Sequence, residues 1–216
     1  MYKYVFPFEQ IKSIKSFFLP SLPVTNAPSK PRNELFKIFC PQSDVVMIGD
    51  SITEYALWNE IFPYIRIANR GVGCDRTDDI LERMEEIFSV NAKKAFLMFG
   101  INDIFAGVDV NTIFNNYIQI IKKLQDKNIS CYVQSTLECS KLGHELQLKY
   151  IRSLNRKLKK YCTSNGLEYI NINNEIDESD YTADGIHLLA SGYLKWSKTI
   201  ALYFPAEYQK VELHKN

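Results

Sequence analysis

The sequence predicts an α/β fold in which helices cover both faces of a parallel β-sheet. From residue 44 onward, short strand-like runs alternate with longer segments whose apolar residues recur at helical spacing. Such alternation is typical of a parallel sheet whose connecting helices pack on its two faces. The chain has 216 residues, of which 46% are hydrophobic and 24% charged, as in one ordinary globular domain.

The predicted strands are short runs that end at turn residues. The first, 45–48, consists of four apolar residues that lead directly into Gly49, Asp50 and Ser51. The third, 95–99, is apolar throughout, so we expect it at the centre of the sheet, where both faces are covered. The five predicted strands are 45–48, 64–68, 95–99, 130–134 and 167–172.

The predicted helices lie between and after these strands. Each carries apolar residues on one face, which is the pattern of a helix packed on a sheet. Asn165 and Gly166, just after the predicted helix 145–163, supply its stop signal. The four predicted helices are 76–88, 111–127, 145–163 and 189–203.

Residues 1–41 differ from the rest because they contain six of the eight prolines. Proline removes a backbone donor, so this stretch cannot form a long helix or an interior strand. Its aromatic content argues against full disorder. We therefore predict an N-terminal arm of residues 1–41 and a domain of residues 42–216. The arm packs on the domain or on a second subunit, and the second alternative would make the protein a homo-oligomer.

Composition excludes several classes of partner. The net charge of +1 gives no electrostatic reason to expect a nucleic acid or an anionic membrane surface. No apolar run is long enough to span a bilayer, and the first 20 residues lack the features of a signal peptide. We therefore expect a cytoplasmic protein.

The sequence predicts neither disulfides nor a metal or other cofactor. Its five cysteines are scattered and include no C-x-x-C pair, and its three histidines lack metal-binding spacing.

Ser51 is the first candidate for chemistry. It follows the strand 45–48 directly, and open α/β sheets bind ligands beyond the carboxyl ends of their strands. A serine at a strand-to-helix turn is a suitable nucleophile because backbone N–H groups there favour developing negative charge. A turn in which Ser51 or Thr53 only caps the helix explains the same residues equally well.

Three further motifs are expected at the same edge of the sheet. The glycines in 69–75 allow backbone N–H groups to approach an anion, and Asn102 can direct its amide at an oxyanion. Asp184 lies three residues before His187, so its carboxylate can bond Nδ1 and leave Nε2 free for Ser51. Each motif alone is also an ordinary turn. Their combination favours a serine hydrolase.

The four motifs together resemble those of the SGNH hydrolases, also called the GDSL esterase/lipase family. The matching segments are 49–52 for the nucleophile block, 69–71 for the glycine block, 100–103 for the asparagine block and 184–187 for the acid–base block. The end of the motif series, 184–193, is similar to the acetylhydrolase subgroup related to platelet-activating-factor acetylhydrolase catalytic subunits. The resemblance covers about residues 44–205.

This resemblance implies a flavodoxin-like three-layer sandwich with a five-stranded parallel sheet in the order 2-1-3-4-5, and no metal. It implies a triad of Ser51, His187 and Asp184. It also implies an oxyanion hole made by the Ser51 N–H, the Asn102 amide and one further backbone N–H. Cys74 stands where the family usually has glycine. The further donor is therefore either Gly73 or Cys74.

We predict a serine esterase, a carboxylic ester hydrolase, that cleaves short acyl esters, with an O-acetylated carbohydrate as the first expected substrate. The connections at the carboxyl edge are short, which leaves little chain for a lid or an acyl tunnel. Asp50, Tyr55 and Trp58 are candidate substrate-binding residues. The two aromatic rings could stack on a sugar, although we expect at least one of them to pack against the domain instead. Alternatives are an acyltransferase, lysophospholipase or thioesterase with the same site, or a non-catalytic binding module.

Overall fold

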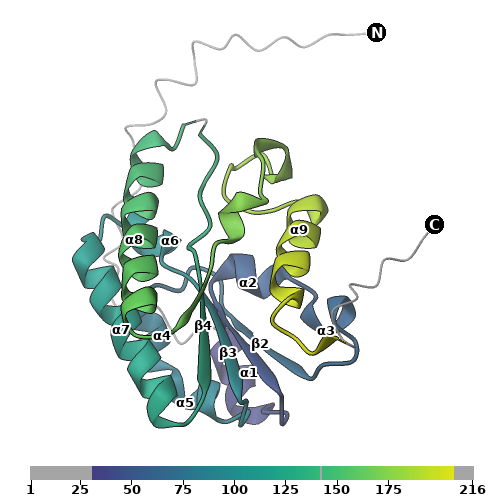
Figure 1. Cartoon of the computed structure of the whole chain (residues 1–216). Helices are drawn as coiled ribbons and strands as arrows, with labels where there is room; N and C mark the ends of the chain where they lie inside the picture. The colour runs from purple at the N-terminus through teal and green to yellow at the C-terminus, as the bar shows by residue number, and fades with distance from the viewer. Residues whose placement is uncertain (1–30, 142, 207–216) are drawn as a thin grey trace, which may run out of the picture. The chain divides into compact units, whose positions relative to one another are not determined.

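The computed structural model describes residues 31–141 and 143–206, and within them a five-stranded parallel sheet. The strand order is β2-β1-β3-β4-β5, so the predicted fold class and order are confirmed (Figure 1). Strand β3 lies at the centre, as its apolar sequence predicted. The strands are β1 (Val45–Gly49), β2 (Ile67–Gly71), β3 (Lys94–Met98), β4 (Ser130–Gln134) and β5 (Glu168–Ile170).

Helices lie on both sides of this sheet. Helices α7 and α8 cover one side, whereas α3 and α9 lie on the other (Figure 1). The helices are α1 (Pro31–Ile38), α2 (Ser51–Tyr55), α3 (Trp58–Ile61), α4 (Thr77–Glu82), α5 (Met84–Phe88), α6 (Ile101–Phe105), α7 (Val110–Asp126), α8 (Glu145–Ser164) and α9 (Ala190–Ala201). Short 3₁₀ turns span Ile172–Asn174 and Glu178–Asp180. None of the helices in the described part is long and apolar enough to cross a membrane.

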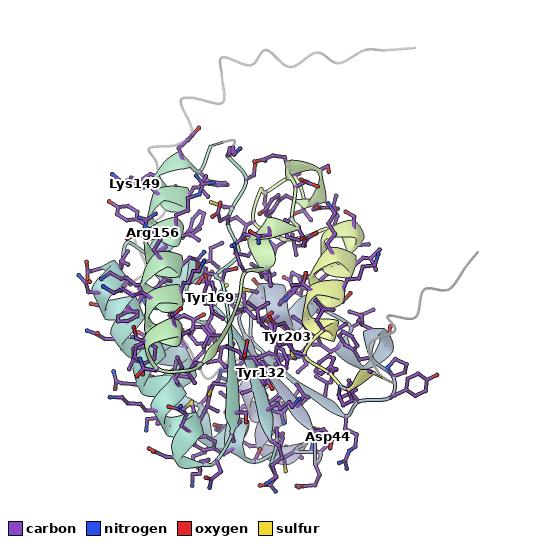
Figure 2. All side chains as sticks on the ribbon, viewed as in Figure 1. Asp44, Tyr132, Lys149, Arg156, Tyr169 and Tyr203 are labelled. Carbon is purple, nitrogen blue, oxygen red and sulfur yellow. The ribbon has the colours of Figure 1, made fainter. Side chains whose placement is uncertain are left out.

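Helix α8 shows how a one-sided apolar pattern fixes a helix on the sheet. Ile151, Leu154 and Leu158 are fully buried, whereas Lys149 and Arg156 point into solvent from the outer side of the helix (Figure 2). Burial of apolar surface is the main favourable contribution to such packing, at about 25 cal/mol per Å². The predicted helix 145–163 therefore forms almost as expected, with its end at Asn165.

Aromatic contacts attach α9 and α3 to the opposite side. The Trp58 ring meets the Trp196 ring edge-on, with their centroids 4.9 Å apart. Phe204, just beyond α9, makes ring contacts with Phe62 and Phe96 at 4.9 and 5.5 Å. Edge-to-face pairs of this kind contribute about 0.5–1.5 kcal/mol beyond their buried area. The segment after the nucleophile is thus held against the last helix.

Strand β2 begins three residues later than predicted. The sequence predicted 64–68, whereas the strand spans Ile67–Gly71 and contains two polar residues. The Asn69 amide donates to three backbone carbonyls in the neighbouring α2 region. The guanidinium of Arg70 lies over the Phe36 ring, 4.1 Å from its centroid. These polar side chains are satisfied inside the fold, so apolar periodicity alone placed the strand too early.

The predicted helix 76–88 is two helices. Helices α4 and α5 meet at Arg83, whose φ of −104° and ψ of 26° interrupt the helical path. The Arg83 side chain is buried and donates to Asp75 at 2.6 Å and to the carbonyls of Gly49 and Arg70 at 3.3 and 2.9 Å. The interruption coincides with these inward contacts, which the spacing of apolar residues could not reveal.

The predicted arm lies mostly outside the described residues, which begin at residue 31. Residues 31–38 form α1, whose Phe36 is buried and whose nearest helical neighbour is α5. This part of the predicted arm therefore belongs to the same compact unit as the domain, which spans residues 31–216. The role of residues 1–30, including the predicted contact with a second subunit, stays a prediction.

Candidate active site

Ser51 lies at the junction between β1 and α2. Asp50 caps the helix, because its Oδ1 accepts a hydrogen bond from the Ile52 N–H at 3.0 Å. The cap is therefore Asp50, and neither Ser51 nor Thr53 is needed for it. A side chain at Gly71 would approach the Glu54 backbone nitrogen to 2.3 Å, so glycine permits α2 to pack directly on the next strand. The Ser51 hydroxyl is left available at the edge of the sheet.

The structure brings the three predicted triad residues together. Ser51 Oγ lies 2.9 Å from His187 Nε2, and His187 Nδ1 lies 2.6 Å from Asp184 Oδ2. Partial burial by itself raises the pKa of Asp184, but hydrogen bonds from His187, Thr182 and backbone N–H groups outweigh it and hold that pKa below its usual value. The carboxylate therefore stays ionised, with one oxygen facing the imidazole.

A short hairpin-like loop sets the distance between the acid and the base. The Thr182 N–H donates to the His187 carbonyl at 2.8 Å, and Gly185 adopts a φ of +69° inside the turn. The Ser140 N–H donates to the Gly185 carbonyl at 2.7 Å. His144 Nε2 lies 3.0 Å from the carbonyl oxygen of Asp184. The connection after β4 thus supports the loop from outside.

The glycine block forms a tight turn beside Ser51. The Asp75 N–H donates to the Val72 carbonyl at 3.1 Å, so Gly73 and Cys74 are the two central residues. Cys74 has a φ of +61°, the conformation that the third residue of a type II turn needs and that glycine adopts most easily. This explains physically why a glycine suits that position. The Gly73 N–H is not free, because it donates to a carboxylate oxygen of Glu54 at 2.6 Å.

Asn102 faces the same turn from α6. Its Nδ2 donates to the Asp75 carbonyl at 2.9 Å, which leaves its second amide hydrogen for another acceptor. The neighbouring Asp103 carboxylate accepts hydrogen bonds from the Thr77 backbone and hydroxyl at 3.0 and 2.6 Å. Burial raises the pKa of Asp103 to about 6. These contacts fix the start of α6 against the start of α4 and so hold Asn102 beside the turn.

Of the three predicted substrate-binding residues, only Tyr55 is placed to contact a ligand. It is 58% exposed, and its ring centroid lies 5.3 Å from that of His187. Asp50 and Trp58 are 0% and 2% exposed, so Asp50 is not placed to contact a substrate, and Trp58 packs inside the domain, the alternative that the sequence also allowed for one of the two rings. Burial raises the pKa of Asp50 to about 7, and Trp58 is enclosed by α9. Both residues support the nucleophile junction from inside.

Two residues near the site, Glu54 and Arg83, were missed in the sequence. Glu54 lies one helical turn after Ser51, and its carboxylate meets the glycine block. Arg83 and Asp75 form a buried ion pair that links the glycine block to the strand before Ser51. The i, i+3 spacing of Ser51 and Glu54 was a usable signal, since residues three apart share a helix face. Nothing local predicted the partner of Arg83.

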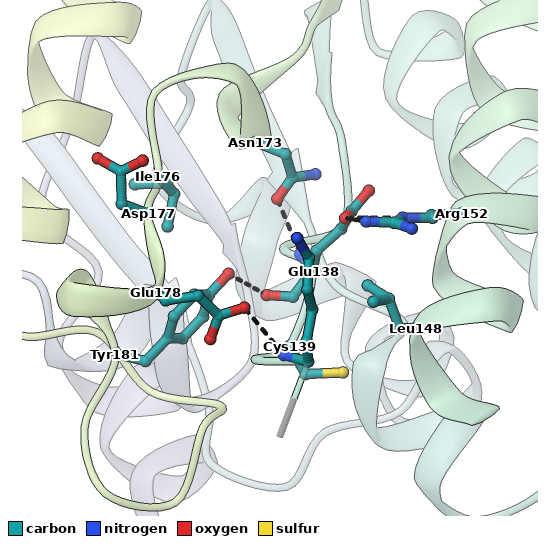
Figure 3. Close-up of a pocket in the computed structure, with 10 residues that line it drawn as sticks. Glu138, Cys139, Leu148, Arg152, Asn173, Ile176, Asp177, Glu178 and Tyr181 are labelled. Atoms are coloured by element: carbon teal, nitrogen blue, oxygen red, sulfur yellow. Dashed lines mark hydrogen bonds and ion pairs between the residues drawn. The ribbon is translucent and has the colours of Figure 1, made fainter. Parts of the chain in front are cut away.

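A separate pocket of about 270 Å³ lies on the carboxyl edge, between the connections that follow β4 and β5 (Figure 3). Several of its polar side chains make hydrogen bonds to one another or to neighbouring residues. Arg152 donates to Glu138 at 2.9 Å, Glu178 accepts from the Ser140 hydroxyl at 2.6 Å, and Tyr181 donates to the Glu138 carbonyl. These pairs brace the segment that supports the acid–base loop. No cluster of three metal-binding side chains occurs in the part of the chain that the structure describes.

Comparison with known sequences assigns the fold and motifs to one family. Residues 47–195 match the model of the GDSL-like Lipase/Acylhydrolase family. A curated relative, the N-acylneuraminate cytidylyltransferase of Streptococcus agalactiae serotype V, is 22% identical over 156 residues. The match covers 70% of this chain but only 36% of that enzyme. The chain therefore spans about a third of the length of the curated relatives it matches.

Solved structures share the fold along most of the chain. One, provisionally described as a platelet activating factor from Streptococcus pneumonia, has 26% identity and a TM-score of 0.71, and the match covers 81% of this chain and 90% of that one. An acetylxylan esterase from Geobacillus stearothermophilus has 12% identity and a TM-score of 0.64, covering 76% and 94% of the two chains. At the latter identity the likeness shows the fold alone.

Proposed function

The chain belongs to the GDSL-like Lipase/Acylhydrolase family, and from this premise we propose that it is a carboxylic ester hydrolase whose catalytic triad is Ser51, His187 and Asp184. The observation that carries the proposal is the continuous chain of contacts from Ser51 Oγ through the imidazole to the Asp184 carboxylate, at 2.9 and 2.6 Å. Both distances lie within the range expected for a nucleophile, its base and the group that orients the base.

In the proposed reaction His187 Nε2 accepts the Ser51 proton while Ser51 Oγ attacks the carbonyl carbon of the ester. His187 then gives that proton to the departing alcohol, which leaves an acyl group on Ser51. Water, deprotonated by the same imidazole, attacks the acyl-enzyme and releases the carboxylic acid. Asp184 holds the imidazole with Nδ1 protonated and stabilises its positive form.

The oxyanion formed in each step needs hydrogen-bond donors. We assign the N–H groups of Ser51 and Cys74, which make no hydrogen bond within the described residues, together with the second amide hydrogen of Asn102. Gly73, the alternative to Cys74, already donates to Glu54. Donors fixed in advance around the developing charge need no reorganisation during the reaction, which is why they lower the barrier.

Asn102→Ala is expected to lower kcat by about 10²–10³-fold with little change in KM, because its amide meets the oxyanion in the transition state and not the ground-state ester. Steady-state kinetics with p-nitrophenyl acetate measure both constants. Asn115→Ala is the matched control, since this amide is exposed on α7. A change confined to KM would contradict the assigned role.

We propose a short acyl group on a carbohydrate as the substrate. Side chains around Ser51 are exposed, including Tyr55 and Cys74, which supports an open site that does not enclose a long chain. The exposed Tyr55 ring beside His187 could stack on a sugar face. The name of one curated relative, an N-acylneuraminate cytidylyltransferase of which the match covers 36%, supports the same direction because an N-acylneuraminate is an acylated sugar.

A series of p-nitrophenyl esters tests the acyl preference. We expect kcat/KM to be highest for the acetyl ester and to fall through the butyryl, octanoyl and dodecanoyl esters, because an open site offers no apolar tunnel to bury a longer chain. Acetylated xylo-oligosaccharides and an O-acetylated N-acylneuraminate then test the carbohydrate, with release of acetate as the measurement. An optimum at octanoyl or beyond would instead favour a lipid or a long-chain thioester.

A further inference from the structure

The carboxylate of Glu54 occupies an unexpected place beside the proposed oxyanion hole. Its Oε2 accepts the Gly73 N–H at 2.6 Å, which is shorter than most N–H···O hydrogen bonds. Its Oε1 lies 3.5 Å from Nε of Arg32 in α1. The same Nε donates to the Gly71 carbonyl at 2.7 Å. One ion pair therefore connects α1, the nucleophile helix α2 and the glycine block.

The hydrogen bonds of the turn show what this contact decides. The Asp75 N–H closes the turn by donating to the Val72 carbonyl, and the Gly73 N–H donates to the Glu54 carboxylate. The Cys74 N–H makes no hydrogen bond within the described residues. A Cβ at Gly73 would lie only 3.9 Å from Ser51 Cβ, so the peptide in question is beside the nucleophile. Fixing the Gly73 N–H on Glu54 leaves Cys74 as the donor that can face the reacting carbonyl.

The ion pair with Arg32 neutralises the negative charge of the Glu54 carboxylate beside the proposed oxyanion hole. An unneutralised carboxylate next to an oxyanion would raise the energy of the transition state by repulsion. The side chains of Glu54 and Arg32 are only 25% and 32% exposed, so solvent screens this repulsion incompletely. The Arg32 guanidinium offsets it while the hydrogen bond to Gly73 is kept.

We propose that Glu54, paired with Arg32, is a positioning residue of the oxyanion hole: it holds the Gly73 N–H and thereby presents the Cys74 N–H to the substrate. The inference rests on the proposed function of Ser51. It adds α1 to the active-site structure, although the sequence placed residues 31–38 in an arm without a motif residue. Glu54 acts through the turn and does not contact the substrate.

Glu54→Ala and Glu54→Gln in the full chain test this proposal. Alanine removes the acceptor, so the turn loses its fixed orientation, and kcat for p-nitrophenyl acetate should fall about 10–100-fold while KM changes less than about twofold. Glutamine keeps an oxygen that can accept the Gly73 N–H, so it should restore kcat to within about threefold of the parent. Glu60→Gln, an exposed change on α3, is the matched control and should leave both constants unchanged.

Amide hydrogen exchange of Gly73, followed by NMR, tests the hydrogen bond without any catalysis. The Gly73 N–H should exchange slowly in the parent and at least about tenfold faster in Glu54→Ala. Fast exchange in the parent would overturn the proposal, as would an alanine variant with parental kcat or a glutamine variant as impaired as alanine. If instead the parent cleaves no ester and Ser51 resists fluorophosphonates, the proposed function fails. In that case, slow exchange at Gly73 would show that the hydrogen bond to Glu54 exists but serves no catalysis, and the positioning role would be overturned as well.

Discussion

Replacing Ser51 with alanine is expected to lower kcat for ester hydrolysis by about 10⁴–10⁶-fold, the loss seen when a triad nucleophile is removed. The Ser51 hydroxyl has one hydrogen-bond partner among the described residues, His187 Nε2. Its removal therefore deletes the attacking atom without breaking a structural contact. The melting temperature should change little, because the cap on α2 is supplied by Asp50.

Two measurements make this result specific. A fluorophosphonate should label the parent protein on Ser51 and should not label Ser51→Ala, which also separates an enzyme from a binding module with the same fold. Ser89→Ala is the matched control, because that hydroxyl bonds the Glu86 carbonyl on α5, away from the triad. Residual activity within tenfold of the parent in Ser51→Ala would contradict the assignment of the nucleophile.

The triad residues could be selected from the sequence because the fold collects them by a simple rule. Ser51 and Asn102 follow β1 and β3, and parallel strands end at one edge of the sheet. Local motifs that follow different strands therefore meet without any knowledge of tertiary contacts. His187 and Asp184 are only three residues apart, so a single loop fixes their geometry. These positions depend on order along the chain, which sequence shows directly.

The supporting residues could not be predicted because their partners are distant in sequence. Glu54 meets Gly73 across 19 positions, and Arg32 reaches Gly71 across 39. The sequence left open which of Tyr55 and Trp58 faces a sugar, because an aromatic residue near a nucleophile has the same sequence signature whether it faces solvent or the core. Only the position of α9 decides between these alternatives, and it buries Trp58.

Polar residues inside regular elements caused the two larger errors in element boundaries. Asn69 and Arg70 belong to β2 although they interrupt its apolar pattern, and Arg83 separates α4 from α5 although the apolar spacing continues through it. In each case a buried or partly buried polar side chain donates to carbonyls from elsewhere in the fold. Hydrophobic periodicity reports which side of an element is covered. It does not report a polar group whose cost of burial is offset by a tertiary hydrogen bond.

Replacing His187 with alanine is expected to lower kcat about as much as replacing Ser51, by about 10⁴–10⁶-fold, because the two act as one unit. Without the imidazole, no other group in the described residues lies within hydrogen-bond distance of Ser51 Oγ to take its proton. The Ser51→Ala/His187→Ala double variant should be no slower than either single variant. Steady-state rates of the three variants against the uncatalysed reaction test this non-additivity.

The second histidine near the site provides the control for this result. His144 lies 3.0 Å from the backbone carbonyl of Asp184 and packs against Phe105, so it supports the acid–base loop from outside. The Asp184 carboxylate, held in its ionised form, still faces His187 when His144 is absent. His144→Ala should therefore keep kcat within about tenfold of the parent, since it weakens a supporting contact and removes no reacting group. A loss at His144 as large as that at His187 would mean that the base has been assigned to the wrong imidazole.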